Sequence, residues 1–501
     1  MHKEKKLYYI GLGIALLFAI AYVACIDIFS FPWRDEVGTS DTAVNVALYG
    51  EWTSRVWKYS YNPLHAFLLI GWLKLWGVSH LTVCSFTVLL AIVGYAILLK
   101  ILQKRELLTE ITSVVIFTLL YWGGFEFAGL ITLGRTDLLV MIFTMLVVNE
   151  LAPTKDGGFY NISRWPTLIY SFLLMGASIY SIPVLCCYCL MFYFTTEDKG
   201  VRKELLWRYL HAIIGFTMSF VLVCLFFYSV HGLFKFINSF MSFNATITHD
   251  DEGRGLIARL ADAYSTDIYA LVVLAAGGAL LAVKKSFKNK QTLANVLFAL
   301  CIPMLMVFAG RYRFYYSWIF YVPVVVIAGF AVDKLQRKWV AVAILCVISI
   351  TVALRPVVMS KKNAEKRIEL ANVKDFFDDS ASYLSAGDNV VFNNSMFYYP
   401  IVEKRCNPWQ KYKGLQDIPQ PEEKFKAFID KKIKDEEKKE QFLAIFYQME
   451  HSEPYLPESG YFFTEGDEEY QKTIEFMQER GFCIEKIMGK NGFSLLKFDR
   501  N

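Results

Sequence analysis

The sequence predicts an all-α polytopic membrane protein with about eleven transmembrane helices, followed by a small soluble α/β domain. Of its 501 residues, 55% are apolar and 16% are aromatic, which exceeds the usage of soluble globular proteins. Apolar segments recur through residues 7–354, whereas residues 356–501 carry charged runs and few long apolar stretches. The net charge of +5 is small for this length, so no nucleic-acid partner is expected.

The basic stretches between the apolar segments orient the chain. Stretches 100–105, 199–208, 284–290 and 334–338 are rich in Lys and Arg, so they and the N-terminus should face the cytoplasm. Eleven spans satisfy all of these loops: 7–26, 81–100, 110–127, 138–152, 166–180, 183–195, 209–230, 266–283, 293–309, 314–333 and 339–354. The apolar segment 63–76 is shorter than the roughly 20 residues that a span needs. We therefore expect it to form a juxtamembrane or re-entrant helix within one long outer loop, residues 27–80.

With a cytoplasmic N-terminus and an odd number of spans, residues 356–501 should lie on the periplasmic side of the inner membrane. Strands are expected at 389–393 and 442–447, and an amphipathic helix at 468–480. Segments 483–488 and 493–498 flank an Asn491-Gly492 pair, which is typical of a β-hairpin turn. Cys406 and Cys483 could form a disulfide there or remain free, and the sequence leaves both open.

Candidate functional residues gather in three outer loops. They are Trp33, Asp35, Glu36, Arg55, Lys58, Tyr61 and Asn62 in the first, Arg135 and Asp137 in the second, and Arg311, Arg313 and Tyr315 in the third. Carboxylates are costly at bilayer depth, so a pair held at the membrane edge indicates a site. Arginine binds phosphate through a planar fork, and a carboxylate can act as a general base. One side of the membrane thus has the groups to bind a phosphate-bearing amphiphile.

Ordinary structural roles compete with this interpretation. Asp35 and Glu36 could be solvated residues at the start of a surface helix, where acidic side chains are favoured. Asp137 could cap the fourth span, and Arg311 and Arg313 could be interfacial charges in an aromatic belt. His65 is more typical of a packed or surface histidine than of a ligand. The gathering of all these charges on one side favours a functional site.

The motif order resembles a known family. Trp33-Arg34-Asp35-Glu36 is followed by Asn62-Pro63-Leu64, by segment 73–79 and by Arg135-Thr136-Asp137. This order resembles the bacterial relatives of protein O-mannosyltransferases, which include the lipid A aminoarabinose transferases and have the GT-C membrane fold. Segments 178–183 and 313–323 also resemble that pattern, so the likeness covers roughly residues 1–355. Asn62 departs from it, because the family often has proline, histidine or lysine there.

The resemblance implies an inverting glycosyltransferase that takes a sugar from a polyprenyl-phosphate donor and passes it to an envelope lipid, glycan or protein. Asp35 would activate the acceptor beside Glu36, and Asp137 would be the second carboxylate. The remaining roles would be phosphate binding by Arg311, Arg313, Tyr315, Arg135, Arg55 and Lys58, and contacts to sugar or acceptor by Trp33, Tyr61 and Asn62. A divalent metal ion held by Asp35 and Asp137 is compatible with this chemistry and is left open.

Two other classes remain. A transporter or flippase of envelope lipids or glycans would also have many spans, but such proteins usually bury ionisable groups at the midplane and often show internal repeats. No repeat is evident in this sequence. A non-catalytic membrane subunit would tolerate the loss of Asp35.

Overall fold

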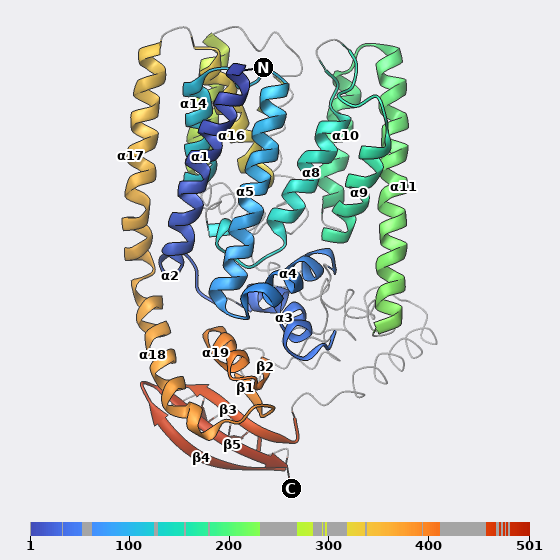
Figure 1. Ribbon diagram of the computed structural model, residues 1–501. Coiled ribbons are helices and arrows are strands. Elements are labelled where there is room, and N and C mark those ends of the chain that lie inside the picture. Colours follow the sequence, from blue (N-terminus) through green and yellow to red (C-terminus); the bar gives the residue numbers. More distant parts are fainter. Residues whose placement is uncertain are drawn as a thin grey trace, which may run out of the picture.

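The protein is a bundle of long helices with a small sheet at one end (Figure 1). The structure, a computed structural model, describes residues 2–32, 34–52, 63–124, 129–154, 157–178, 181–230, 268–283, 318–335, 338–392, 394–410, 457–466 and 481–500, and isolated residues within 293–297 and 470–478. The N-terminus lies at the end of the bundle that is far from the sheet, and the chain ends at the sheet.

Helices occupy ten of the eleven predicted spans. They are α1 (His2–Ala24), α5 (His80–Lys104), α6 (Ile111–Gly123), α8 (Asp137–Leu151), α9 (Trp165–Ala177), α10 (Ser181–Thr195), α11 (Lys199–Val230), α14 (Ile268–Val283), α16 (Trp318–Asp333) and α17 (Lys338–Lys362). Among the described residues, four helices are long and apolar enough to cross a membrane by themselves: 3–24, 80–104, 199–226 and 339–362. The predicted span 293–309 lies almost entirely outside the described residues, so the count of eleven stays a prediction.

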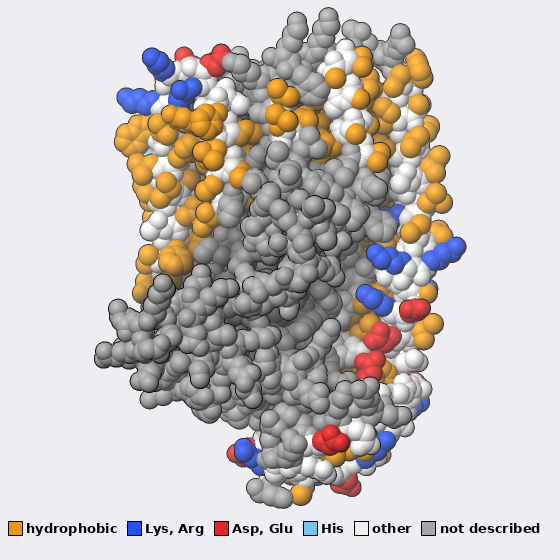
Figure 2. All heavy atoms as spheres, turned by 180° about the vertical axis from the view of Figure 1, so that it is seen from behind, with side chains coloured by type: hydrophobic (Ala, Val, Ile, Leu, Met, Phe, Trp, Pro, Cys, Tyr) orange, Lys and Arg blue, Asp and Glu red, His pale blue; other side chains and the backbone are white. Residues whose placement is uncertain are grey.

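The outside of the bundle is apolar. Large hydrophobic side chains are exposed along α11, such as Ile213 and Leu225, and along α17, such as Val347 and Leu354. Figure 2 shows hydrophobic side chains gathered over the bundle, with charged side chains beyond them toward both ends. A helix surface of this kind is stable in contact with lipid tails, and the chain is accordingly a multi-pass membrane protein.

Charged side chains from later helices hold both ends of α6. Asp333, at the end of α16, accepts hydrogen bonds from the backbone N–H groups of Thr109 and Glu110 at 2.7 and 3.0 Å. Arg355 of α17 donates to the carbonyl oxygen of Gly124 at 2.6 Å and is buried. The carboxylate at the N-terminal end and the guanidinium at the C-terminal end satisfy backbone groups that have no partner within the helix. Both charges also interact favourably with the helix dipole. The two interactions position α16 and α17 against α6.

Short helices lie across the end of the bundle that faces the sheet (Figure 1). They are α2 (Ile26–Phe29), α3 (Arg34–Tyr49) and α4 (Pro63–Trp76). The predicted helix at 63–76 is present as α4, which buries His65, Ala66, Leu69 and Leu73 and contacts α3, α5 and α9; that it does not cross the membrane stays a prediction. Its opposite face exposes Phe67 and Trp76, as expected of a helix that lies at a membrane surface.

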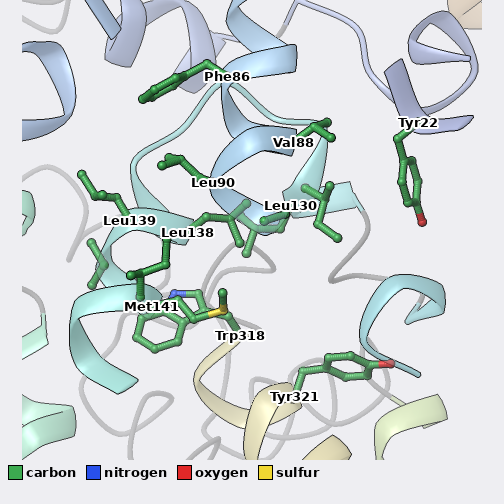
Figure 3. Close-up of a cluster of buried hydrophobic side chains, with 14 of the residues drawn as sticks. Tyr22, Phe86, Val88, Leu90, Leu130, Leu138, Leu139, Met141, Trp318 and Tyr321 are labelled. Carbon is green, nitrogen blue, oxygen red and sulfur yellow. The ribbon is translucent and has the colours of Figure 1, made fainter. Parts of the chain in front are cut away.

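A hydrophobic core lies behind these short helices. Figure 3 shows it as side chains from α5 (Phe86, Val88, Leu90), from the stretch before α8 (Leu130), from α8 (Leu138, Leu139, Met141) and from α16 (Trp318, Tyr321). All of these residues are at most 7% exposed, so they form a continuous packed interior. The first residues of α5 and α8 are therefore held at fixed positions relative to each other.

A mixed sheet forms the C-terminal part. Its elements are α18 (Ala364–Ser380), η3 (Ala381–Tyr383), β1 (Asn389–Phe392), η4 (Ser395–Phe397), α19 (Tyr398–Glu403), β2 (Asn407–Gln410), β3 (Ser459–Glu465), β4 (Phe482–Lys490) and β5 (Phe493–Arg500). The strand order is β2-β1-β3-β5-β4, in which β1 runs parallel to β2 and β3, and β5 is antiparallel to β3 and β4. Phe376 of α18 packs against Phe463 and Phe493, so α18 covers one face of the sheet.

Several predictions for this part are confirmed. Strand β1 and the β4–β5 hairpin have nearly the predicted bounds, and Asn491 and Gly492 have φ of 55° and 81°, as the hairpin turn requires. Strands β2 and β3 were not predicted. The strand expected at 442–447 lies outside the described residues, and the helix expected at 468–480 is described only in part. Cys406 and Cys483 are not joined by a disulfide in this structure.

Helix α17 continues past the end of the last predicted span. It runs through Arg355 and Pro356 to Lys362, and Asn363 then donates to the carbonyl oxygen of Ile28 at 2.8 Å before α18 begins. The division into parts 1–355 and 356–501 stays a prediction, because no break in the helix marks it. Because α17 is continuous and its end is tied to α2, we expect the sheet to be held in a fixed position next to α3.

The arrangement predicts the membrane topology. The end of α5 and the C-terminal sheet lie at opposite ends of the bundle, and the basic loop at Lys104 and Arg105 should be cytoplasmic. We therefore expect an alkaline phosphatase reporter, active only in the periplasm, to be active when fused after Asn501 and inactive when fused after Arg105. A cytoplasm-specific fluorescent reporter should give the reverse pattern, and equal activity at both positions would contradict this topology.

Candidate functional site

Glu36 is the buried centre of the site. It lies in the first turn of α3, its side chain is 0% exposed, and its Oε1 accepts a hydrogen bond from Tyr399 Oη at 3.0 Å. His80 Nε2 lies 3.3 Å from the same oxygen. The second oxygen, Oε2, is buried without a hydrogen-bond partner among the described residues. The alternative in which Glu36 is a solvated loop residue is therefore wrong.

The second outer loop packs directly against Glu36. Asp137 begins α8, and its Oδ2 accepts from Arg135 Nε at 2.8 Å in a pair that is almost buried. A Cβ atom added to Gly134 would lie 3.0 Å from Glu36 Cγ and 2.2 Å from Val83 Cγ1, so only glycine fits this contact without a shift. The structure thus brings the first and second predicted clusters together.

His65 of α4 lies close enough to this loop for the charge of Arg135 to act on it. Both ring nitrogens are buried without a hydrogen-bond partner among the described residues, and the ring packs edge-on against Phe86 with centroids 5.7 Å apart. Burial, and then the positive charge of Arg135, lowers the pKa of His65 to about 3. It is therefore a packed neutral histidine, one of the two ordinary roles that the sequence favoured.

Helix α19 contributes two tyrosines to α3. Tyr399 donates to Glu36, and Tyr398 Oη donates to Asp41 Oδ1 at 2.7 Å. Burial and then the facing carboxylates, Asp41 for Tyr398 and Glu36 for Tyr399, raise the pKa of both phenols well above their usual range. Both stay protonated and donate charge-assisted hydrogen bonds. These bonds, with that from Tyr49 Oη to the Cys406 carbonyl at 3.1 Å, dock the C-terminal part onto α3.

Two residues at the start of α5 complete the surroundings of Glu36. His80 and Cys84 are one helical turn apart, with His80 Nε2 and Cys84 Sγ separated by 3.3 Å. Ser79 caps the N-terminus of the helix, and its Oγ accepts from the backbone N–H of Thr82 at 3.1 Å. Donor atoms of Glu36, His80 and Cys84 all lie within 4.8 Å of one another, a spacing that could hold a metal ion.

Sequence reasoning missed His80, Cys84 and Tyr399. The spacing of His80 and Cys84, four residues apart at the start of an apolar span, was a usable signal, because it places both side chains on one helix face. No local pattern pointed to Tyr399, which comes from a distant part of the chain. The sequence left open a metal ion held by Asp35 and Asp137. The donor atoms that gather in the structure are instead those of Glu36, His80 and Cys84, while Asp137 pairs with the Arg135 guanidinium.

Most of the other predicted site residues lie outside the described residues. These are Trp33, Arg55, Lys58, Tyr61, Asn62, Arg311, Arg313 and Tyr315. The backbone of Asp35 is in the first turn of α3, immediately before Glu36, but its side chain is not among the described ones. The roles of all of these residues stay predictions.

Comparison with known proteins identifies the fold. No family model matches the chain, and no curated protein matches it by sequence. The crystal structure of ArnT from Cupriavidus metallidurans bound to undecaprenyl phosphate matches with a TM-score of 0.60 and 12% identity, over 98% of this chain and 97% of that one. The apo state of the same protein matches with a TM-score of 0.55 and 11% identity, over 97% and 98% of the two chains.

The chain therefore has the GT-C membrane fold, and the resemblance found in its motifs is confirmed at the level of fold. The structure that it matches over nearly its whole length is ArnT, a lipid A aminoarabinose transferase. The match includes the C-terminal part, for which the sequence alone suggested no relative. A third structure, the Archaeoglobus fulgidus oligosaccharyltransferase in complex with Zn and sulfate, has a TM-score of 0.49 and 12% identity, over 91% of this chain and 68% of that one, which is too weak a likeness to argue from.

The buried neutral state of His65 predicts a pH dependence. Its folded pKa of about 3 lies below the value near 6.5 of an unfolded histidine. Between these two pH values the imidazole of His65 is protonated only in the unfolded chain. The free energy of unfolding therefore falls as pH drops from about 6.5 toward 3, by at most about 1.4 kcal/mol per pH unit. We expect the Tm of His65→Phe to fall less than that of wild type when pH is lowered from 7 to about 4.5. The control His211→Asn, on α11, should behave as wild type, and equal slopes for wild type and His65→Phe would contradict this account.

Proposed function

We propose that this chain is a membrane glycosyltransferase that takes a sugar from a polyprenyl-phosphate donor and transfers it to an envelope acceptor. The observation that carries the proposal is the meeting of the two carboxylate-bearing loops at one end of a bundle with the ArnT fold. The matched ArnT structure is bound to undecaprenyl phosphate, which supports the donor class. The acceptor, whether lipid, glycan or protein, would reach the site from the periplasm.

The location of the site supports this assignment. It lies at the end of the bundle where α3 and α4 meet the C-terminal part, away from the basic loop at Lys104 and Arg105. A polyprenyl phosphate places its head group at the membrane surface while its chain remains among lipid tails. The exposed apolar face of α4, with Phe67 and Trp76, would provide such a boundary.

The reaction requires a base and a stabilised leaving group. In our proposal the Asp35 carboxylate takes the proton of an acceptor hydroxyl as that oxygen attacks the anomeric carbon. The bond from this carbon to the phosphate oxygen breaks, and its electron pair leaves with the phosphate. Attack from the face opposite the phosphate inverts the anomeric centre. A base in hydrogen-bond reach of the hydroxyl contributes about a hundred- to ten-thousand-fold to such a step.

We assign Glu36 to positioning rather than to proton transfer. Its carboxylate is fully buried and interacts with Tyr399 and His80, so it is not open to an acceptor. Its contacts fix the first turn of α3, which also contains Asp35. In the same way, Asp137 would orient Arg135 through their 2.8 Å ion pair.

The donor phosphate would be bound by basic residues of the outer loops. Arg311 and Arg313, with Tyr315, are our primary candidates, and Arg135, Arg55 and Lys58 would add positive charge. Trp33, Tyr61 and Asn62 would contact the sugar or the acceptor. A transporter or flippase remains the alternative, and it predicts that the purified chain transfers no sugar.

Replacing the proposed base should abolish most activity. We expect Asp35→Asn to lower turnover by about a hundred- to ten-thousand-fold with unchanged donor binding, because the amide cannot accept the proton. The assay uses purified protein, a labelled polyprenyl-phosphate sugar and extracted envelope acceptors. Glu458→Gln, an exposed carboxylate of the C-terminal part, is the matched control. Near-normal transfer by Asp35→Asn would overturn the role of Asp35, and no transfer by wild type would favour the transporter.

Removing a phosphate-binding arginine should weaken the donor complex. We expect Arg311→Ala or Arg313→Ala to raise the apparent KM for the donor while the amount of protein in the membrane stays unchanged. Lysine at the same position should restore affinity only in part, because it lacks the bidentate fork. Arg367→Ala, on the exposed side of α18, serves as control. If neither arginine affects donor KM, the phosphate site would have to be sought at Arg55 and Lys58.

A further inference from the structure

We propose that Glu36, His80 and Cys84 form a zinc site that fixes the first turn of α3 to the start of α5. The site shares Glu36 with the candidate functional site but does not include the proposed base, Asp35. Its ligands are the only three-residue group of metal-binding side chains found among the described residues. The proposal does not depend on the glycosyltransferase assignment, because metal content and activity are measured separately.

The distances fit tetrahedral zinc. His80 Nε2 lies 3.3 Å from both Cys84 Sγ and Glu36 Oε1, and Sγ lies 4.0 Å from Oε1. With bonds of about 2.0 to 2.3 Å, the ligand atoms around a tetrahedral zinc ion are about 3.3 to 3.6 Å apart. Small side-chain shifts would therefore bring all three atoms to bonding distance. His80 and Cys84 lie one turn apart on α5, and Glu36 comes from α3. This arrangement of two ligands from one helix and a third from another suits such an ion.

The chemistry of the donors favours zinc over magnesium or calcium. Imidazole and thiolate are ligands of borderline and soft metals, whereas magnesium and calcium prefer oxygen atoms. On binding, the Cys84 thiol would release its proton to solvent, and His80 would coordinate through its neutral ring. The negative charges of the thiolate and of Glu36 would then balance the charge of the ion.

A second observation, the unpaired oxygen of Glu36, also points to a ligand. The Glu36 side chain is 0% exposed, yet its Oε2 has no hydrogen-bond partner among the described residues. Burying such an oxygen unpaired costs several kcal/mol. A metal ion bound beside Glu36 and the α5 ligands would give this oxygen a partner.

Residues around the three ligands would orient them. Tyr399 Oη donates to Glu36 Oε1 at 3.0 Å, and Ser30 Oγ lies 3.7 Å from Cys84 Sγ. Such partners orient ligands and typically change metal affinity by about 10- to 100-fold. Through Tyr399, the C-terminal part would thus contribute to metal affinity, and through Glu36 the ion would hold the turn that contains Asp35.

Metal content tests the proposal directly. Protein purified in detergent without chelator should carry about one zinc ion per chain by elemental analysis. We expect His80→Ala and Cys84→Ala each to lower this content at least about tenfold. Cys346→Ser, which replaces an exposed cysteine on α17, should leave it unchanged. Wild-type protein that retains no zinc after incubation with zinc and gel filtration would overturn the site.

Cobalt substitution keeps the test independent of variant folding. Chelator-treated wild-type protein titrated with Co²⁺ should develop a thiolate-to-cobalt charge-transfer band and the intense visible bands of tetrahedral cobalt. Tyr399→Phe should show the same bands with an affinity about tenfold weaker. Asp35→Asn should bind cobalt as wild type does, which separates this site from catalysis. Absence of the charge-transfer band in wild type would show that Glu36, His80 and Cys84 form only a hydrogen-bonded cluster.

Discussion

A buried carboxylate, Glu36, joins three parts of this protein. Its removal from water is costly, and such a charge is tolerated only where partners supply hydrogen bonds or opposite charge. The partners come from α5 (His80) and from α19 (Tyr399), while Gly134 of the second outer loop packs against its side chain. Because none of these elements can shift without exposing or unpairing the carboxylate, Glu36 sets their relative positions and with them the geometry of the site.

The helix bundle makes this arrangement rigid. Asp333 and Arg355 hold the two ends of α6, so α17 is anchored deep in the bundle before it extends toward the sheet. Asn363 then ties the junction between α17 and α18 to α2. A helix fixed in this way presents α19 to α3, where Tyr398 and Tyr399 find their carboxylate partners. The C-terminal part thus closes one side of the site through the contacts of Tyr398 and Tyr399 with α3.

Hydropathy predicted the helices because lipid-facing and core-facing residues are both apolar, and ten to twenty such residues in a row leave few alternatives to a helix. The helix at 63–76 was predicted for the same reason, since it is a continuous apolar run. Strands β2 and β3 escaped prediction because Asn407–Gln410 is only four residues long and begins beside a proline, and Ser459–Glu465 lacks regular alternation. The hairpin was found because its turn needs positive φ, which Asn491 and Gly492 adopt readily.

The sequence by itself determined the class of the protein, the run of membrane helices and the two carboxylate loops, because each depends on local composition or on a short motif. It did not reveal the pairing of Glu36 with Tyr399, the burial that keeps His65 neutral, or the approach of His80 and Cys84 to Glu36. Those interactions join residues up to 363 positions apart. Only the tertiary structure decided them, because the energy of a charge depends on which distant groups replace its water.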